Sequence, residues 1–257
     1  MRNYDAQKDR GPLGYAGGVA VYATTLIVAT HIVTMVLTTI AVSAGARGLL
    51  DFFSFSSGAI FHHGFVWKLI TYPFVNEPSL WFAWNMFIIF FCGKELETFF
   101  GRRAFLGFYA SAILIASASS AVFGIFIPCE MSGCWLPHFA VFAAYAFVFP
   151  RMVFCWIPVI WTALVLFTIY SLQFIAYHEW SDLFALWMTT GATWLWTKWQ
   201  RGHFQIKFAA RKKVEPVIER SENVDALLDK IGTHGLHSLT ASERRQLEKA
   251  REKLMGK

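Results

Sequence analysis

Charge is scarce in this chain. Only 16% of its 257 residues are Asp, Glu, Lys or Arg, whereas 56% are hydrophobic. A soluble domain carries roughly 25% charged residues, so the composition argues against a water-soluble protein. Residues 201–257 hold 13 of the 23 basic and 8 of the 17 acidic residues. A basic, polar tail therefore follows an apolar body.

Two further absences narrow the class of protein. The start lacks a cleavable signal peptide, because about 18 polar or glycine-rich residues precede an apolar stretch of about 26, against the 7 to 15 of a signal core. The apolar stretches also lack charge at mid-length, where transport paths usually need polar groups. We therefore expect the first apolar stretch to be retained, and we disfavour a transporter or channel.

Long apolar runs are what the sequence does have, and they predict an all-α membrane protein with six transmembrane helices. A spanning helix needs roughly 17 to 25 apolar residues. The runs lie at about 19–44, 79–98, 104–127, 134–150, 152–175 and 181–199. We divide the chain into an N-terminal segment (1–18), a six-helix membrane domain (19–200), a basic linker (201–221) and a tail (222–257).

Basic residues indicate how the chain is oriented. On this topology two basic residues, Arg47 and Lys68, lie on one side. The other side has Arg2, Lys8, Arg10, Lys94, Arg102, Arg103, Arg151, Lys198 and the tail. The positive-inside rule then predicts that both termini are cytoplasmic. The first outer loop, Gly45 to Pro78, is rich in aromatic residues, which favour the membrane interface.

Residues 133–151 read GCWLPHFAVFAAYAFVFPR. This stretch resembles the fourth membrane helix of the rhomboid family of intramembrane serine proteases, G-x-S-G-x-x-F-G-x-x-G-A-Y followed by F-P. The matching residues are Gly133, Phe139, Ala144, Tyr145, Phe149 and Pro150. In this alignment Trp135 stands at the position of the catalytic serine, and Leu136 at the glycine beside it.

A second block, residues 67–109, resembles the family's W-R-x-x-T-Y-x-F-x-H, H-x-x-x-N-M, G-x-E-L-E-x-x-x-G and F-L-x-x-Y patterns. The residues that agree are Trp67, Thr71, Tyr72, Phe74, Asn85, Met86, Gly93, Glu95, Leu96, Glu97, Gly101, Phe105, Leu106 and Tyr109. Asn85 is retained, but Trp81 stands where the family has the histidine that helps to bind the oxyanion.

The family's catalytic base is a histidine in the last membrane helix, within H-L-x-G-x-x-x-G. Residues 181–200 contain no histidine. One register places Asp182 at the base and puts Ala185 and Thr189 on the two glycines, which keeps small residues four apart for close helix packing. A second register, with Gly191 on the last glycine, places Phe184 at the base.

The resemblance implies a scaffold without its chemistry. Peptide cleavage by this route needs a nucleophile, a base and oxyanion donors. The family supplies a serine, a histidine base, and a histidine and an asparagine for the oxyanion. Of these four groups this chain keeps only the asparagine, Asn85. We predict a pseudoprotease that binds the transmembrane segments of client proteins and influences their folding, trafficking or degradation, as inactive rhomboids and derlins do. We also predict that Trp135 and Trp81 fill the former active site.

An active protease with an atypical site is the alternative. Ser132, next to Gly133, would be its nucleophile, with His138 or His178 as the base. Asp182 has two interpretations, a cap at the start of its helix or a partner of His138. Cys129 and Cys134 bracket an outer loop, where an oxidising environment would permit a disulfide; two free thiols are the alternative.

The tail resembles a helical hairpin that follows the last membrane helix in many bacterial rhomboids, which favours a bacterial inner membrane. Thr240 and Glu243 form a capping box, and Gly232 and Gly235 are expected to end the preceding helix. The basic linker suits anionic lipid rather than nucleic acid. His234 and His237 lack companions at ligand spacing, so we expect no metal and no other cofactor. We make no prediction of oligomeric state.

Overall fold

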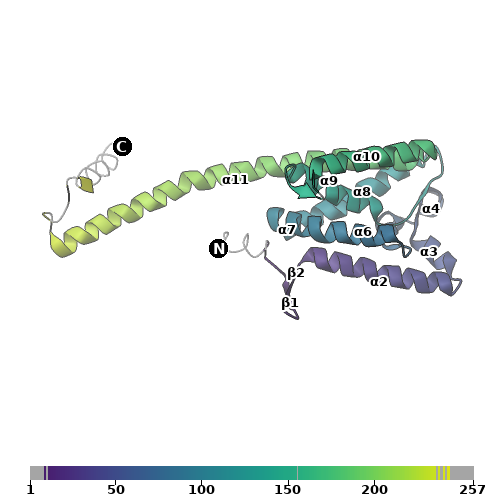
Figure 1. Cartoon of the computed structure of the whole chain (residues 1–257), viewed down its shortest axis with the longest axis horizontal. Coiled ribbons are helices and arrows are strands. Elements are labelled where there is room, and N and C mark those ends of the chain that lie inside the picture. The colour runs from purple at the N-terminus through teal and green to yellow at the C-terminus, as the bar shows by residue number, and fades with distance from the viewer. Residues whose placement is uncertain are drawn as a thin grey trace. The chain divides into compact units, whose positions relative to one another are not determined.

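The computed structural model describes residues 9, 11–154, 156–235, 237, 240, 242 and 243, with side chains except at 16, 19, 154 and 202–227. The chain divides into two compact units, Met1–Trp199 and Gln200–Lys257. Most of the first unit is helical, as the sequence predicts (Figure 1).

Short helices and hairpins connect the long helices of the first unit. The hairpins are β1 (Gly14–Ala16) with β2 (Val19–Val21) and β5 (Val153–Phe154) with β6 (Ile157–Pro158), both antiparallel. A third antiparallel pair, β3 (Phe55–Ser56) with β4 (Glu130–Met131), joins two loops that are distant in the sequence. The helices are α2 (Ala23–Ser43), α3 (Arg47–Phe53), α4 (Ser57–His63), α5 (Lys68–Thr71), η1 (Tyr72–Phe74), α6 (Leu80–Ile88), η2 (Ile89–Gly93), α7 (Lys94–Phe100), α8 (Arg102–Phe123), α9 (Trp135–Val148), α10 (Val159–Ala176) and α11 (Trp180–His234). The first outer loop is therefore largely helical.

Three helices of the described residues, α2, α8 and α10, are long and apolar enough to cross a membrane. The other predicted spans differ from simple helices. Residues 80–100 form α6, the π-helical turn η2 and α7, α9 has only 14 residues, and residues 181–199 are the first part of α11. The all-α membrane fold is confirmed, and the count of six spans stays a prediction.

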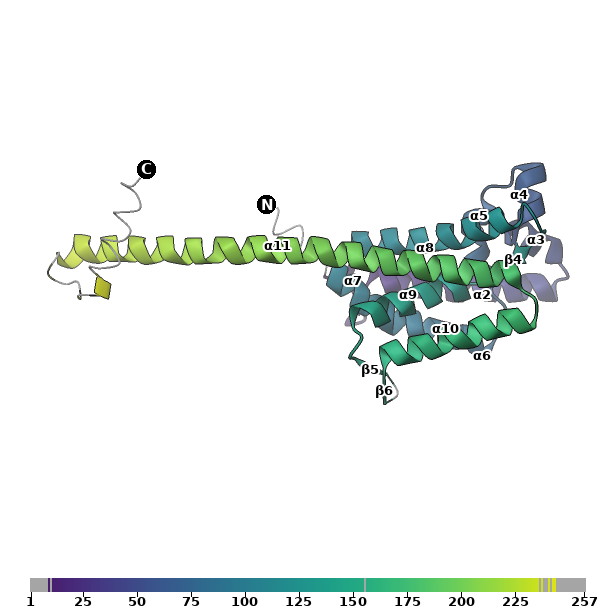
Figure 2. The same cartoon turned by 90° about the horizontal axis from the view of Figure 1, so that it is seen from above.

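Helix α9 is the centre of the first unit. It packs against α8, α10, α6, α7 and η2, and Figure 2 shows it between α8 and α10. All but three of its 14 residues are buried. Pro137 lies in its first turn, where a missing N–H costs nothing, and Pro150 follows its end. The stretch that resembles the family's nucleophile helix thus forms the core.

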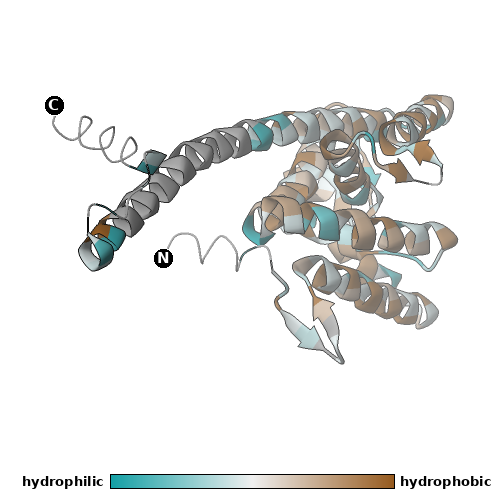
Figure 3. Cartoon of the chain, turned by 60° about the vertical axis from the view of Figure 1, so that its left-hand side comes forward, coloured by the Kyte–Doolittle hydropathy of each residue, from teal (hydrophilic) through white to brown (hydrophobic). Residues whose placement is uncertain are grey.

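The outer surface of the first unit is apolar, as lipid requires. The ribbons of its helices are mostly hydrophobic in Figure 3. Large apolar side chains are exposed along α2 and α10, among them Val33, Leu37, Leu164 and Leu172, while polar His31 on α2 is fully buried. Lipid tails provide no hydrophobic drive to hide such side chains.

Small residues line the buried face of the last membrane segment. Ala185, Thr189, Thr193 and Thr197, four apart, are all buried, whereas Gly191 is exposed. Closely packed membrane helices use small residues at this spacing. The two residues that stand on the family's glycines in the Asp182 register, Ala185 and Thr189, are thus both buried, and the register itself stays a prediction.

Retained motif residues fix the ends of helices. The carboxylate of Glu97 is fully buried and accepts bonds from the N–H of Ala23 at 3.0 Å and of Thr24 at 2.9 Å. It thereby satisfies donors at the start of α2 that have no partner within the helix. A Cβ added to Gly93 would lie 2.8 Å from Thr24 Cγ2, so glycine permits α2 and η2 to approach.

The second unit confirms the predicted capping box. The N–H of Thr240 donates to Glu243 Oε2 at 2.7 Å, and the N–H of Glu243 donates to Thr240 Oγ1 at 3.4 Å. Gly235, at φ +76°, follows the end of α11. Gly232 lies within the helix, so the prediction that it ends the helix is wrong; an interior glycine costs only about 1 kcal/mol. Residues 201–221 belong to the same helix, and the side chains of the basic linker from residue 202 on lie outside the described residues.

Candidate functional site

The start of α9, where the family has its nucleophile, is held by the segment before α6. The N–H of Gly133 donates to the carbonyl of Tyr72 at 3.0 Å, and the N–H of Cys134 donates to Asn76 Oδ1 at 3.0 Å. Asn76 also donates to the carbonyl of Pro73 at 2.6 Å. Sequence reasoning did not single out Asn76, whose buried amide fixes the position of Trp135.

The two tryptophans at catalytic positions lie in different surroundings. The Trp135 ring packs against Tyr170 and Phe174 of α10, with centroids 5.6 and 5.3 Å away. Trp81 is 65% exposed. Aromatic stacking and lipid contact are both favourable for indoles, so neither ring needs the former active site.

An open pocket of 660 Å³ lies beside these residues, and the predicted filling of the site is wrong. The pocket is lined by α2, α3, α6, the segment 75–79 and residues 130–135, and it reaches all four positions of interest. These are Trp81, Asn85, Ser132 and Trp135. The expectation assumed that bulky side chains would point inward, whereas α10 offers Trp135 an aromatic partner.

Ser132, the alternative nucleophile, has no histidine beside it as a base. Ser132 is exposed at the pocket, whereas His138 is fully buried. His178 lies at the loop before α11 and contacts the ring of Trp180. Within the described ranges no hydrogen bond joins Ser132 to a histidine. The pocket therefore has a hydroxyl but, among the described residues, no histidine that is hydrogen-bonded to it.

Asp182 lies in the first turn of α11. A carboxylate there interacts favourably with the helix dipole, although no side-chain capping bond of Asp182 is present in the part of the chain described. Its proposed pairing with His138 is not found: the His138 ring contacts His31 of α2 and Tyr109 of α8. Asp182 instead lies near the Cys129 thiol.

Cys129 and Cys134 are free thiols, so the disulfide interpretation is corrected. The Cys129 thiol donates to the carbonyl of Ser120 at 3.1 Å, and burial raises its pKa. Cys134 is 2% exposed and faces the interior of the helical unit. The two side chains serve different neighbours.

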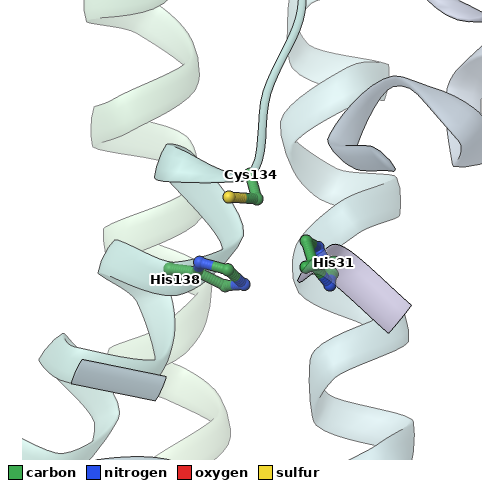
Figure 4. A group of neighbouring side chains, drawn as sticks. All are labelled: His31, Cys134 and His138. Atoms are coloured by element: carbon green, nitrogen blue, oxygen red, sulfur yellow. The ribbon is translucent and has the colours of Figure 1, made fainter. Parts of the chain in front are cut away.

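Cys134 belongs to a buried cluster that sequence reasoning missed. One ligand atom from each of His31, Cys134 and His138 lies within 4.8 Å of the others, and Figure 4 shows these three side chains together. Tyr109 Oη lies 3.4 Å from His31 Nε2 and 3.2 Å from His138 Nε2. Cys134 and His138 are four residues apart on one face of a helix, which was the available signal. Nothing in the sequence connects His31 to them.

A second pocket, of 610 Å³, is almost wholly apolar. It lies between α2, α3 and the segment 71–75, and its lining includes Leu37, Ile40 and Phe53. Thr38, Leu50 and Val75 line both this pocket and the larger one. The apolar pocket and the larger pocket with polar walls are therefore adjacent.

Comparison with protein families gives two matches. A family model described as "Rhomboid domain" matches residues 63–201, more than half of the chain. One described as "Family of unknown function (DUF6576)" matches residues 215–251. No curated protein and no solved structure matched. The first match includes Trp81, Asn85, Trp135 and Asp182.

Proposed function

Because the chain belongs to the rhomboid family, we propose that it is a pseudoprotease, a membrane protein that binds the transmembrane segments of other proteins without cleaving them. The observation that carries this proposal is the indole of Trp135. It occupies the nucleophile position, stacks on Tyr170 and Phe174, and leaves an open pocket beside it.

The lack of catalytic groups at this pocket supports the proposal that the chain does not cleave peptides. An activated serine needs a base within about 2.6 to 3.2 Å, and Ser132 has no histidine partner among the described residues. Trp81 replaces the family's second oxyanion group and is mostly exposed. Asn85 alone of the expected groups lines the pocket.

The two adjoining pockets support the binding of a membrane segment. An apolar helix suits the apolar pocket, and the polar end of the same segment suits the larger one, which has Asn76, Glu77 and Ser79 on its wall. Shared residues such as Leu50 and Val75 would contact the client at the junction. A bound segment would influence the folding, trafficking or degradation of its protein.

Localisation follows from the same assignment. We place the chain in a bacterial inner membrane because its tail resembles the hairpin of bacterial rhomboids, and we place both termini in the cytoplasm on the basis of its loop charges. The basic residues after the last membrane segment, such as Lys207 and Arg211, would face anionic lipid.

An active protease is the second candidate, because Ser132 and Asn85 line the same pocket. His138 cannot act as its base in the present arrangement, since His138 is buried between His31 and Tyr109.

Reconstitution in liposomes tests the proposal. The full chain, carrying a photocrosslinking residue at Leu50 or Val75, is mixed with a labelled single-span helix. Leu164 provides the matched control, because it is exposed on α10 and lines neither pocket. We expect crosslinks at Leu50 and Val75 that excess unlabelled helix suppresses, few at Leu164, and no cleavage of the helix.

A serine-reactive phosphonate and a Ser132→Ala variant complete the design. Cleavage or labelling that Ser132→Ala abolishes would establish the protease instead. Equal crosslinking at all three positions would show that the helix contacts the chain without preference for the pockets, which would contradict the proposal.

A further inference from the structure

The cluster of His31, Cys134 and His138 has the composition of a transition-metal site. Its ligand atoms lie within 4.8 Å of one another, and all three side chains are buried. Two imidazoles and one thiolate bound at about 2.0 to 2.3 Å would stand somewhat closer to one another, so a small inward movement would let them share one ion. The residues come from two helices, α2 and the start of α9 (Figure 4).

The hydrogen bonds leave lone pairs available for an ion. His31 Nδ1 lies 2.9 Å from the carbonyl of Ile27, which can only accept, so Nδ1 carries the proton and Nε2 bears the lone pair. Such a bond to the second nitrogen is typical of histidine ligands, since it fixes tautomer and ring orientation.

His138 supplies an unpartnered atom. Tyr109 has one hydroxyl proton for two Nε2 atoms. If Tyr109 accepts from the N–H of His138 Nε2, its own proton faces His31 Nε2 at 3.4 Å, a long hydrogen bond that an ion bound at His31 Nε2 would replace. The Nδ1 lone pair of His138 is buried and has no hydrogen bond. A buried polar atom left unsatisfied costs about 1 to 3 kcal/mol. Coordination of an ion would remove that cost.

The types of ligand atom in the cluster, and their total charge, indicate which metal ion fits best. Thiolate and thioether ligands favour Cu(I), and imidazole also suits copper. Cys134 shares a small apolar cluster with Met86, against which Met35 packs, so two thioethers lie nearby. The group contains no carboxylate. One thiolate therefore neutralises Cu⁺ but leaves Zn²⁺ with an excess positive charge, which is costly in a membrane interior.

We propose that His31, Cys134 and His138 bind one copper(I) ion, a site separate from the former catalytic positions. Cu⁺ replaces the thiol proton of Cys134, and that proton leaves to solvent. Cys134 lines the 660 Å³ pocket, which provides a path for the ion to enter. Binding ties α2 to α9 and depends neither on a client nor on peptide cleavage.

Anaerobic titration of the purified full chain in detergent with Cu(I), buffered by a chromogenic chelator, tests the site. We expect one copper per chain. His31→Ala, Cys134→Ala and His138→Ala should each lower the affinity by more than about 100-fold, because loss of an outer partner alone costs 10 to 100-fold. Cys129→Ala and His178→Ala are the matched controls and should bind copper like the wild type, since both residues lie outside the cluster.

X-ray absorption of the copper-loaded wild type gives a readout that does not depend on the folding of any variant. Sulfur and imidazole scattering in the first shell is expected. No copper bound, copper retained by Cys134→Ala, or zinc bound in preference to copper would each overturn the proposal. The crosslinking assay for client binding uses no copper, and the copper titration uses no client helix. A failure of the copper proposal is therefore distinguishable from a failure of the proposed function.

Discussion

Single residues show what the sequence could and could not reveal. Trp135 and Trp81 were identifiable by counting within a motif, because helical spacing fixes which position faces the site. The direction of their rings was not, since it depends on Tyr170 and Phe174 of another helix. His31 was missed for the same reason: its neighbours lie more than a hundred residues away.

Glu97 is the residue whose chemistry is most clearly structural. We expect Glu97→Gln to destabilise the fold by about 1 to 3 kcal/mol, because an amide NH₂ would face the N–H groups of α2 and leave a buried donor unpaired. The matched control is Glu95→Gln, which changes an exposed carboxylate in the same motif. Chemical unfolding in detergent micelles measures both. Equal stability of the two variants would contradict the capping role of Glu97.

At the scale of elements, the retained glycines and small residues mark where helices approach. The buried series from Ala185 to Thr197 was predictable in its first two members, because four-residue spacing is visible in the sequence. The π-helical turn Ile89–Gly93 was not predictable, since it adjusts α6 and α7 to neighbours that the local sequence does not show. Such turns are rare inside helices and often lie near functional sites.

Gly93→Ala tests the close approach of η2 to α2. The added methyl would meet Thr24 Cγ2 at 2.8 Å and Phe105 Cζ at 3.2 Å, so we expect a loss of about 1 to 3 kcal/mol from overpacking. Gly107→Ala in α8 is the control, because nothing lies within 4 Å of its added Cβ; it should be neutral or stabilising by about 0.4 to 1 kcal/mol. Thermal unfolding in detergent compares the two, and a neutral Gly93→Ala would show that the helices can separate without cost.

At the scale of the whole molecule, composition alone identified a membrane protein, and motif order identified its family. The lengths of the apolar runs were sufficient to predict the all-α membrane fold class. The arrangement of the pockets needed the structure, because their walls combine α2, α3, α6 and residues 130–135.

Orientation is the property of the whole chain that charge predicts. In a variant without native cysteines, we expect a cysteine at Phe61, exposed on α4, to react with an impermeant maleimide from outside the cell. A fluorescent protein that folds only in the cytoplasm, fused after Lys257, should be bright. A labelled cysteine at Phe61 together with a dark fusion would contradict the predicted topology.

The shortness of α9 affects the bilayer itself. Its 14 residues extend about 21 Å at 1.5 Å per residue, roughly 9 Å less than a hydrocarbon core of about 30 Å. Because α9 is enclosed by its neighbours, at least one of its ends lies below the level of the lipid headgroups. At the start of α9, such a shortfall would place the neighbouring pocket in a recess below the headgroups. A membrane segment with a polar break at that depth would find hydrogen-bonding groups there that lipid cannot supply.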